Sequence, residues 1–215
     1  MRKLFHYLVC ICFIMILLVG LVPTVSADTK DSSEDMITVL STDDDDDDDD
    51  DDDIYVYNGA VYELSDDREA DYIRPKNKKQ KSVVIPATIK KNGKTYRVTA
   101  IEDNAFKGNT ALTNVTIGGY VEDIGDNAFR GCVKLKKITI PAKVDDIGSN
   151  VFNGCKKLKT ITIKSKRLSA DDIENNAFKG ITKYTTIKVP KSKLSAYKKM
   201  FRNHGLSTKV SVKGY

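Results

Sequence analysis

The sequence predicts a repeat solenoid, made mainly of short β-strands with short helical turns. Four segments of the 215-residue chain align with one another, and they start at Ile101, Ile124, Ile147 and Ile173. The offsets between these segments are 23, 23 and 26 residues. A fixed period in the twenties is typical of stacked coils, because one coil alone cannot bury its apolar face.

Apolar residues occupy the same phase in every segment, which is the second observation behind this fold class. Stacking would bring each phase into one interior column. Within a segment, Ile138 and Ile140 alternate with Thr139, as in a short strand with one buried face. The Asn-Ala-Phe-x-Gly stretch predicts a tight turn with glycine at a left-handed exit. The predicted columns are Ile101, Ile124, Ile147 and Ile173; Ala105, Ala128, Val151 and Ala177; Phe106, Phe129, Phe152 and Phe178; Leu112, Leu135, Leu158 and Tyr184; Val115, Ile138, Ile161 and Ile187; and Ile117, Ile140, Ile163 and Val189.

Residues 54–98 are predicted to form a hairpin-rich N-terminal cap, since the terminal coils of a solenoid expose apolar edges that must be covered. A first hairpin is indicated by Asn58-Gly59, the signature of a type I′ turn between two strands, and a second by Asn92-Gly93. The four strands of these hairpins would be residues 54–57, 60–64, 83–85 and 95–98.

Residues 99–190 would hold about four repeats, and residues 191–215 would form a C-terminal cap of one helix and one strand. The helix is predicted because apolar residues recur on one helical face before a glycine stop. Its residues would be Leu194, Tyr197 and Phe201 with Gly205 as the stop, and the strand would contain Val210 and Val212.

Residues 1–27 have the layout of a secretory signal peptide. Arg2 and Lys3 precede an apolar run over residues 8–22, and small residues lead to a predicted cleavage site after Ala27. The run of 15 residues is shorter than the roughly 20 that a membrane span needs, which favours cleavage over an uncleaved anchor. The mature chain would then start at Asp28.

Residues 28–53 are predicted to be a disordered acidic linker. They carry fifteen acidic side chains and one lysine, and residues 43–53 are eleven consecutive aspartates. Such a run repels itself and has no apolar area to bury. Three roles stay open: a solvated spacer, weak capture of divalent cations by neighbouring carboxylates, and screening of the basic domain that follows.

The rest of the chain is strongly basic. Residues 54–215 carry 32 Lys and Arg against 15 Asp and Glu, and residues 156–215 carry 16 against 3. No apolar run after residue 27 is long enough to span a bilayer, which excludes a multi-pass membrane protein.

Residues 124–144 follow the pattern Ile-Gly-x-x-Ala-Phe-x-x-Cys-x-x-Leu-x-x-Ile-x-Ile-Pro-x-x-Val. This pattern resembles the BspA-like leucine-rich repeats of bacterial surface proteins, and the likeness covers about residues 82–190. Lys164 replaces the proline seen at Pro141, and Tyr184 replaces leucine, so the array is expected to end near there. The resemblance implies a leucine-rich-repeat solenoid with a role in cell-surface contact, and it brings no shared catalytic residues.

Lysines and outward strand residues form the candidate ligand-binding set. Lysines stack at fixed phases beside the predicted strands, and a concentration of one sign attracts anionic polymers. The alternative is a lysine-rich face that serves solubility alone. The predicted ligand-binding residues are Lys134, Lys136, Lys137, Thr139, Lys157, Lys159, Thr162 and Lys183.

Three further sets keep phase, and each has a structural explanation beside a functional one. The asparagines are expected to form a buried column that satisfies backbone groups at the turns. The cysteines lie on neighbouring coils, within reach of a disulfide, but buried free thiols are favoured. The acidic pairs would be a solvated stripe, or a cation site if lysines did not compensate them. The sets are Asn104, Asn127, Asn150 and Asn176; Cys132 and Cys155; and Glu122-Asp123, Asp145-Asp146 and Asp171-Asp172.

No catalytic constellation is found in the sequence. It has two histidines, His6 and His204, and neither a metal-spaced Cys/His cluster, a nucleophile elbow nor a phosphate-binding glycine loop. We therefore expect no catalytic residue, metal or cofactor, and a monomeric adhesion or binding module that is secreted or held non-covalently at the cell surface. Its partner would be a surface protein or an anionic glycan or teichoic-type polymer, with no nucleic acid and no membrane contact after cleavage. The alternatives are an extracellular carboxylate-dependent hydrolase and a structural wall component.

Overall fold

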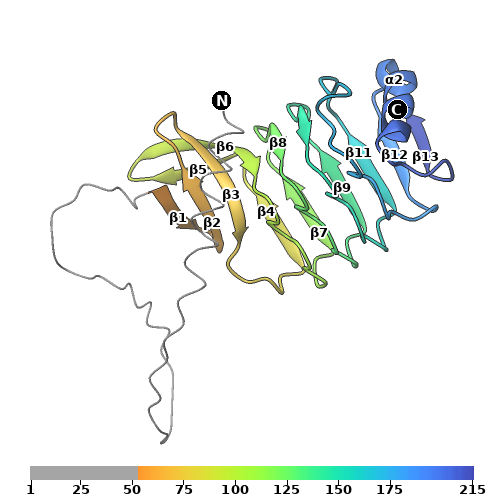
Figure 1. Cartoon of the computed structure of the whole chain (residues 1–215). Coiled ribbons are helices and arrows are strands. Elements are labelled where there is room, and N and C mark those ends of the chain that lie inside the picture. Colours follow the sequence, from red (N-terminus) through yellow and green to blue (C-terminus); the bar gives the residue numbers. More distant parts are fainter. Residues whose placement is uncertain (1–52) are drawn as a thin grey trace, which may run out of the picture. The chain divides into compact units, whose positions relative to one another are not determined.

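The computed structural model describes residues 53–215 (Figure 1). The predictions of a signal peptide at 1–27 and of an acidic linker ending at Asp53 lie, except for that last residue, outside the described residues. The elements are β1 (Ile54–Tyr57), β2 (Ala60–Leu64), β3 (Glu69–Pro75), β4 (Ser82–Ile85), β5 (Thr88–Lys91), β6 (Lys94–Ile101), β7 (Asn114–Ile117), β8 (Asp123–Ile124), β9 (Lys137–Ile140), β10 (Asp146–Ile147), β11 (Thr160–Ile163), β12 (Thr186–Val189), η3 (Lys191–Lys193), α2 (Leu194–Asn203) and β13 (Ser211–Gly214).

The strands form two sheets. The first sheet has the order β1-β2-β3-β6-β8-β10, with β5 paired to β6. The second sheet has the order β13-β12-β11-β9-β7-β4, and its neighbours are parallel, one strand from each coil (Figure 1). The predicted solenoid fold class is therefore confirmed. It has about six coils rather than about four, because β4 and β13 add a coil on either side of the aligned segments.

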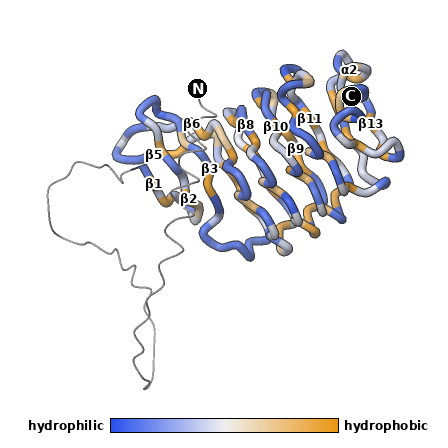
Figure 2. Tube along the Cα trace, viewed as in Figure 1, coloured by the Kyte–Doolittle hydropathy of each residue, from blue (hydrophilic) through white to orange (hydrophobic). Residues whose placement is uncertain are grey.

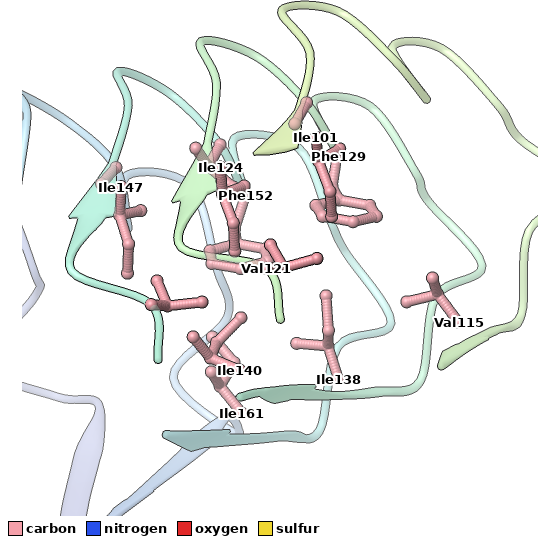
Figure 3. Packing of buried hydrophobic residues seen from close by; sticks show 14 of the residues in the cluster. Ile101, Val115, Val121, Ile124, Phe129, Ile138, Ile140, Ile147, Phe152 and Ile161 are labelled. Carbon is pink, nitrogen blue, oxygen red and sulfur yellow. The ribbon is translucent and has the colours of Figure 1, made fainter. Parts of the chain in front are cut away.

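The core lies between the two sheets. Figure 3 shows Ile101, Ile124 and Ile147 on one side and Ile138, Ile140 and Ile161 on the other, with Phe129 and Phe152 between them. Along each coil, hydrophobic and hydrophilic residues alternate (Figure 2), as a strand with one buried face requires. Every residue of the predicted columns is buried except Ile117, which is half-buried against the core, and Tyr184.

Tyr184 corrects one column. Its side chain is 76% exposed, whereas the next residue, Thr185, is 1% exposed and donates its hydroxyl hydrogen to the carbonyl of Leu158 at 2.6 Å. The tyrosine was assigned to the leucine phase because the alignment had no way to show this shift of one position. The physical reason is that a phenol at this corner can remain in water, while the threonine hydroxyl gains a buried partner.

The aromatic column extends beyond the four aligned phenylalanines. Successive ring centroids of Phe106, Phe129, Phe152 and Phe178 lie 5.1, 6.0 and 5.9 Å apart in stacked arrangements. Tyr72 continues the stack at one end, 5.3 Å from Phe106, and Phe201 continues it at the other, 4.8 Å from Phe178. Aromatic pairs at these separations are favourable beyond the area they bury. One spine of rings therefore connects the N-terminal hairpin strands to helix α2.

The asparagine column is not buried, which corrects the second expectation. Asn104 is exposed, and Asn127, Asn150 and Asn176 are half-buried. All four have positive φ, between 56° and 63°. Asparagine tolerates this left-handed conformation better than other side-chain-bearing residues. The repeated asparagine is thus explained by its backbone angle at the turn, and the glycine that follows four residues later also has positive φ, as the predicted left-handed exit requires.

Neighbouring coils approach closely where a glycine faces an aspartate. The carboxylate of Asp103 accepts a hydrogen bond from the backbone N–H of Asp126, and the carboxylate of Asp126 accepts one from Ser149. A Cβ added at Gly125 or Gly148 would lie 2.7 Å from the backbone nitrogen of Asp103 or Asp126. Glycine in the Ile-Gly pair is therefore required by the close packing of one coil on the next.

The caps are partly as predicted. The first hairpin has its Asn58-Gly59 turn with φ of 46° and 74°, and β1 pairs antiparallel with β2. The second hairpin does turn at Asn92-Gly93, but its first arm is β5. Residues 83–85 belong to β4 instead, which pairs in parallel with β7 and begins the second sheet. Two extended segments precede this turn, and the sequence did not show which of them pairs across it.

The C-terminal helix α2 buries Tyr197 and Phe201 and packs Leu194 against the core, as predicted. Gly205 follows it with a φ of 90°, which suits a glycine stop. The predicted last strand is β13, parallel to β12.

Candidate binding face

The outward positions of the second sheet form two rows that run across all six coils. Strand register aligns them residue by residue, because side chains at i and i+2 share a face. The first row is Ser82, Asn114, Lys137, Thr160, Thr186 and Ser211, and the second row is Val84, Thr116, Thr139, Thr162, Lys188 and Lys213. None of these twelve residues is acidic, so the face offers hydroxyls, one amide and ammonium groups.

The structure brings five of the predicted ligand-binding residues side by side. Lys137 and Thr139 lie on β9, and Thr162 is the register partner of Thr139 on β11. Lys136 and Lys159 precede these strands on neighbouring coils, where the backbone N–H of Lys159 donates to the carbonyl of Lys136 at 2.8 Å. These lysines are exposed, and Thr162 is half-buried.

The remaining three predicted lysines lie in the turns that lead into the strands. Lys134 and Lys157 are exposed and one repeat apart. Lys183 lies on the coil beyond the three-residue insertion, with its Nζ 5.1 Å from the ring centroid of Tyr184. Within residues 53–215, no predicted lysine forms an ion pair with a carboxylate. Their charge is therefore available to a ligand.

Two lysines of the face are missing from the predicted set. Lys188 on β12 is the register partner of Thr162, and Lys213 on β13 is the register partner of Lys188. Both are exposed. Lys213 was not recognised because β13 was assigned to a cap rather than to a sixth coil. One sequence signal pointed to that coil, since Phe201 follows Phe178 by 23 residues, one full repeat.

The acidic stripe belongs to the first sheet, not to the lysine face. Asp123 on β8 is the register partner of Asp146 on β10. The adjoining acids are compensated, because Lys143 Nζ lies 3.4 Å from Glu122 and Arg167 pairs with Asp145. In the described part of the chain, no three His, Cys, Asp or Glu side chains are arranged to hold a metal ion.

Cys132 and Cys155 are free and buried. Each thiol donates to a carbonyl one coil back, that of Phe106 or Phe129, at 3.2 Å. Burial raises the pKa of both thiols, and that of Cys155 reaches about 12. A thiol that remains protonated is a poor nucleophile. The preference for free structural thiols is confirmed, and the disulfide alternative is not.

The face is open rather than pocketed. Two hollows lie elsewhere, beside the N-terminal strands, and none of the predicted ligand-binding residues lines either of them. His204, the second histidine of the sequence, follows the last residue of α2 and is half-buried at that helix end. Among residues 53–215, no helix is both long and apolar enough to cross a membrane.

Comparison with known proteins agrees with this geometry. A family profile described as "BspA type Leucine rich repeat region" matches residues 76–207 in six copies. A leucine-rich repeat protein from Bacteroides ovatus is 27% identical with a TM-score of 0.53, over 64% of this chain and 38% of that one. One from Bacteroides capillosus is 24% identical with a TM-score of 0.41, over 52% and 98%. A leucine rich cell surface protein from Faecalibacterium prausnitzii is 21% identical with a TM-score of 0.35, over 75% and 50%. The search of curated proteins gave no significant match.

Proposed function

Because the chain belongs to the BspA-type leucine-rich repeat family, we propose that it is a non-catalytic binding module that holds anionic polymers on the outer face of its second sheet. It acts outside the cell, released or retained non-covalently at the surface. The polymers are acidic glycans or teichoic-type chains, and a surface protein is the alternative partner.

One observation carries this proposal: the twelve outward positions of the sheet contain no acid, and lysines flank them coil after coil. A single exposed ion pair contributes only about 0–1 kcal/mol. Several lysines on a rigid face act together, so affinity should rise steeply with polymer length. The net positive charge of residues 54–215 adds long-range attraction.

The acids of the domain favour this function over a carboxylate-dependent hydrolase. Such an enzyme needs two carboxylates in unlike environments around one site. Here the acids recur with the repeat, and their partners are structural: Asp103 and Asp126 bind backbone N–H groups, and Glu122 and Asp145 pair with basic side chains. A wall component without a ligand would need no face from which acids are excluded.

The test is a binding series with the mature chain and a long polyanion across salt concentrations. Binding should weaken strongly between 0.1 M and 1 M salt, because the Debye length falls from about 10 Å to about 3 Å. Changing Lys134, Lys136, Lys157 and Lys159 together to glutamine should abolish it. The matched control changes four exposed lysines away from the face to glutamine: Lys90, Lys94, Lys107 and Lys179.

Binding that ignores salt, or that survives the four changes on the face, would remove the proposal and favour an uncharged protein partner. Deletion of residues 28–53 should tighten binding, since that acidic segment competes for the same lysines. Fractionation of the native host into medium, wall and membrane tests the location.

A further inference from the structure

The C-terminal end of the face differs from the rest in combining two neighbouring lysines with an exposed aromatic ring. We propose that Lys188, Lys213 and Tyr215 form a subsite for an acidic pyranose unit, such as a uronic acid, of a bound glycan. The inference rests on the proposed function, and it narrows the ligand from any polyanion to one built of charged sugar rings.

The two lysines lie on adjacent strands. Thr162, Lys188 and Lys213 are successive register partners on β11, β12 and β13. Neighbouring strands lie about 4.8 Å apart, so the two ammonium groups can contact the two oxygens of one carboxylate. No acid occupies the outward rows beside them, so neither lysine is neutralised across the sheet.

Tyr215 continues the outward face two residues after Lys213. Its backbone N–H donates to Val189 at 3.1 Å, and its carbonyl accepts from Lys191 at 3.2 Å. Its hydroxyl donates to the carbonyl of Ile163 at the end of β11, at 3.3 Å. Both ends of the residue are therefore fixed, and the ring reaches from the end of β13 towards β11 while its side chain stays 57% exposed.

This ring differs from the other exposed tyrosines of the domain. Lys143 Nζ lies 4.7 Å from the ring centroid of Tyr120, and Lys183 Nζ lies 5.1 Å from that of Tyr184. Tyr215 has no such cation and no aromatic partner within residues 53–215. It offers a fixed, open aromatic surface, which the apolar C–H face of a pyranose ring can cover.

The combination selects the ligand class. A polyphosphate or a polyol phosphate satisfies the lysines but has no ring to place on Tyr215. A neutral glycan satisfies the ring but not the lysines. An acidic glycan satisfies both, with Thr162 and its row supplying hydroxyls to sugar hydroxyls.

The experiment measures binding of the mature chain to two polyanions of matched charge, polygalacturonate and polyphosphate. Tyr215→Ala should weaken polygalacturonate binding about five- to tenfold, as loss of one aromatic contact does, and change polyphosphate binding less than about twofold. Tyr215→Phe should keep most of the affinity, because the ring remains. Tyr184→Ala, the matched control, should discriminate neither polymer. Lys188→Gln with Lys213→Gln should weaken both polymers more than Lys107→Gln with Lys179→Gln.

The outcomes separate the two proposals. If wild-type protein binds neither polymer, the proposed function and this inference both fail. If it binds both equally and Tyr215→Ala changes both or neither, the subsite is wrong while the polyanion-binding function stands. Selective loss of polygalacturonate supports the subsite, and unchanged thermal unfolding of Tyr215→Phe and Tyr215→Ala shows that the fold is intact.

Discussion

The central coils and the β12 coil have the same core but different corners. In the central coils, β8 and β10 pair over two residues, and Gly148 packs directly on Asp126. In the β12 coil only an isolated bridge joins Ile147 to Ile173, and Glu174 stands in the glycine phase. The three extra residues lie in the segment 164–172, where Leu168 and Ser165 are buried. The second sheet nevertheless stays in register through β12.

The difference teaches that the apolar columns and the second sheet hold the coils together, while the corner before the first sheet tolerates insertion. The first coil supports this view, because the hairpin β5–β6 is inserted at the same corner, between Ile85 and Val98. Closing a somewhat longer loop adds little entropy cost. Five predictions test this view, in order of decreasing effect.

The largest effect is expected from the aromatic spine. Phe129→Ala and Phe152→Ala should each cost about 3–5 kcal/mol of unfolding free energy, because a buried ring leaves a cavity. Phe178→Ala in the β12 coil should fall in the same range, since its ring is 1% exposed and stacked on Phe152. Denaturant melts measure all three. A cost for Phe178→Ala below about 1 kcal/mol would show that the β12 coil is loosely packed and that its corner matters after all.

The corners themselves should differ. Gly148→Ala should cost about 1–3 kcal/mol, because its Cβ would overlap the backbone of Asp126 and force the coils apart. Glu174→Ala, at the same phase of the β12 coil, should change stability by less than about 0.5 kcal/mol. Equal costs in the same denaturant melts would contradict the assignment of tight and tolerant corners.

The turn asparagines are a feature that both regions share. Asn127→Ala should cost about 1–2 kcal/mol, because alanine is strained at the φ of 56°, whereas Asn127→Gly should recover most of the loss. Asn176→Ala, at φ 63°, should behave alike in the β12 coil. If glycine were as destabilising as alanine at either position, the side-chain contacts of asparagine would matter more than its backbone angle.

The cysteine phase distinguishes the regions by pH, since Ile181 replaces the thiol in the β12 coil. Burial raises the pKa of Cys155 from its ordinary value of 9.0 to about 12 and raises that of Cys132 as well. The unfolded chain therefore loses the thiol proton first, so the stabilisation is complete below pH 9 and is lost as pH rises from 9 towards 12. Each thiol should cost up to about 1.4 kcal/mol per pH unit within that window.

The control for this pH effect is the double variant Cys132→Ala and Cys155→Ala. It should start less stable than the wild type, and its stability should fall less between pH 9 and pH 10. A parallel pH dependence of the two proteins in denaturant melts would show that the thiols ionise as readily in the folded state as in the unfolded one.

The sequence predicted the fold where the period is 23 and lost detail where it is not. Phe106, Phe129 and Phe152 revealed themselves by spacing alone. Tyr72 occupies the same column but lies 34 residues before Phe106, because the β5–β6 hairpin intervenes. Phe201 has the right spacing, yet its helical neighbours in α2 concealed the coil. The end coils were therefore assigned to caps.

The binding face was predicted in the same measure. Lys137, Thr139 and Thr162 were correctly placed on outward strand positions, since alternation fixes the face once the strand is known. Whether they bind a ligand stays a prediction. Lys213 and the hydroxyl contact of Tyr215 depend on β13 being a sixth strand of the sheet, which is a tertiary property that no local pattern encodes.

The smallest effect is expected at Tyr184, where the period of the repeat and the packing disagree. Its phase is that of Leu135 and Leu158, which are fully buried, yet its own side chain is 76% exposed. Tyr184→Ala should therefore cost less than about 0.5 kcal/mol, as surface substitutions do, whereas Leu135→Ala should cost about 2–5 kcal/mol. Thr185→Val, which removes the buried hydroxyl donor to Leu158, should cost more than Tyr184→Ala, because the carbonyl loses its partner. Denaturant melts of the three variants decide the point. A cost above about 2 kcal/mol for Tyr184→Ala would mean that the phenol packs in the leucine column in solution, and that the insertion does not shift the register of this coil.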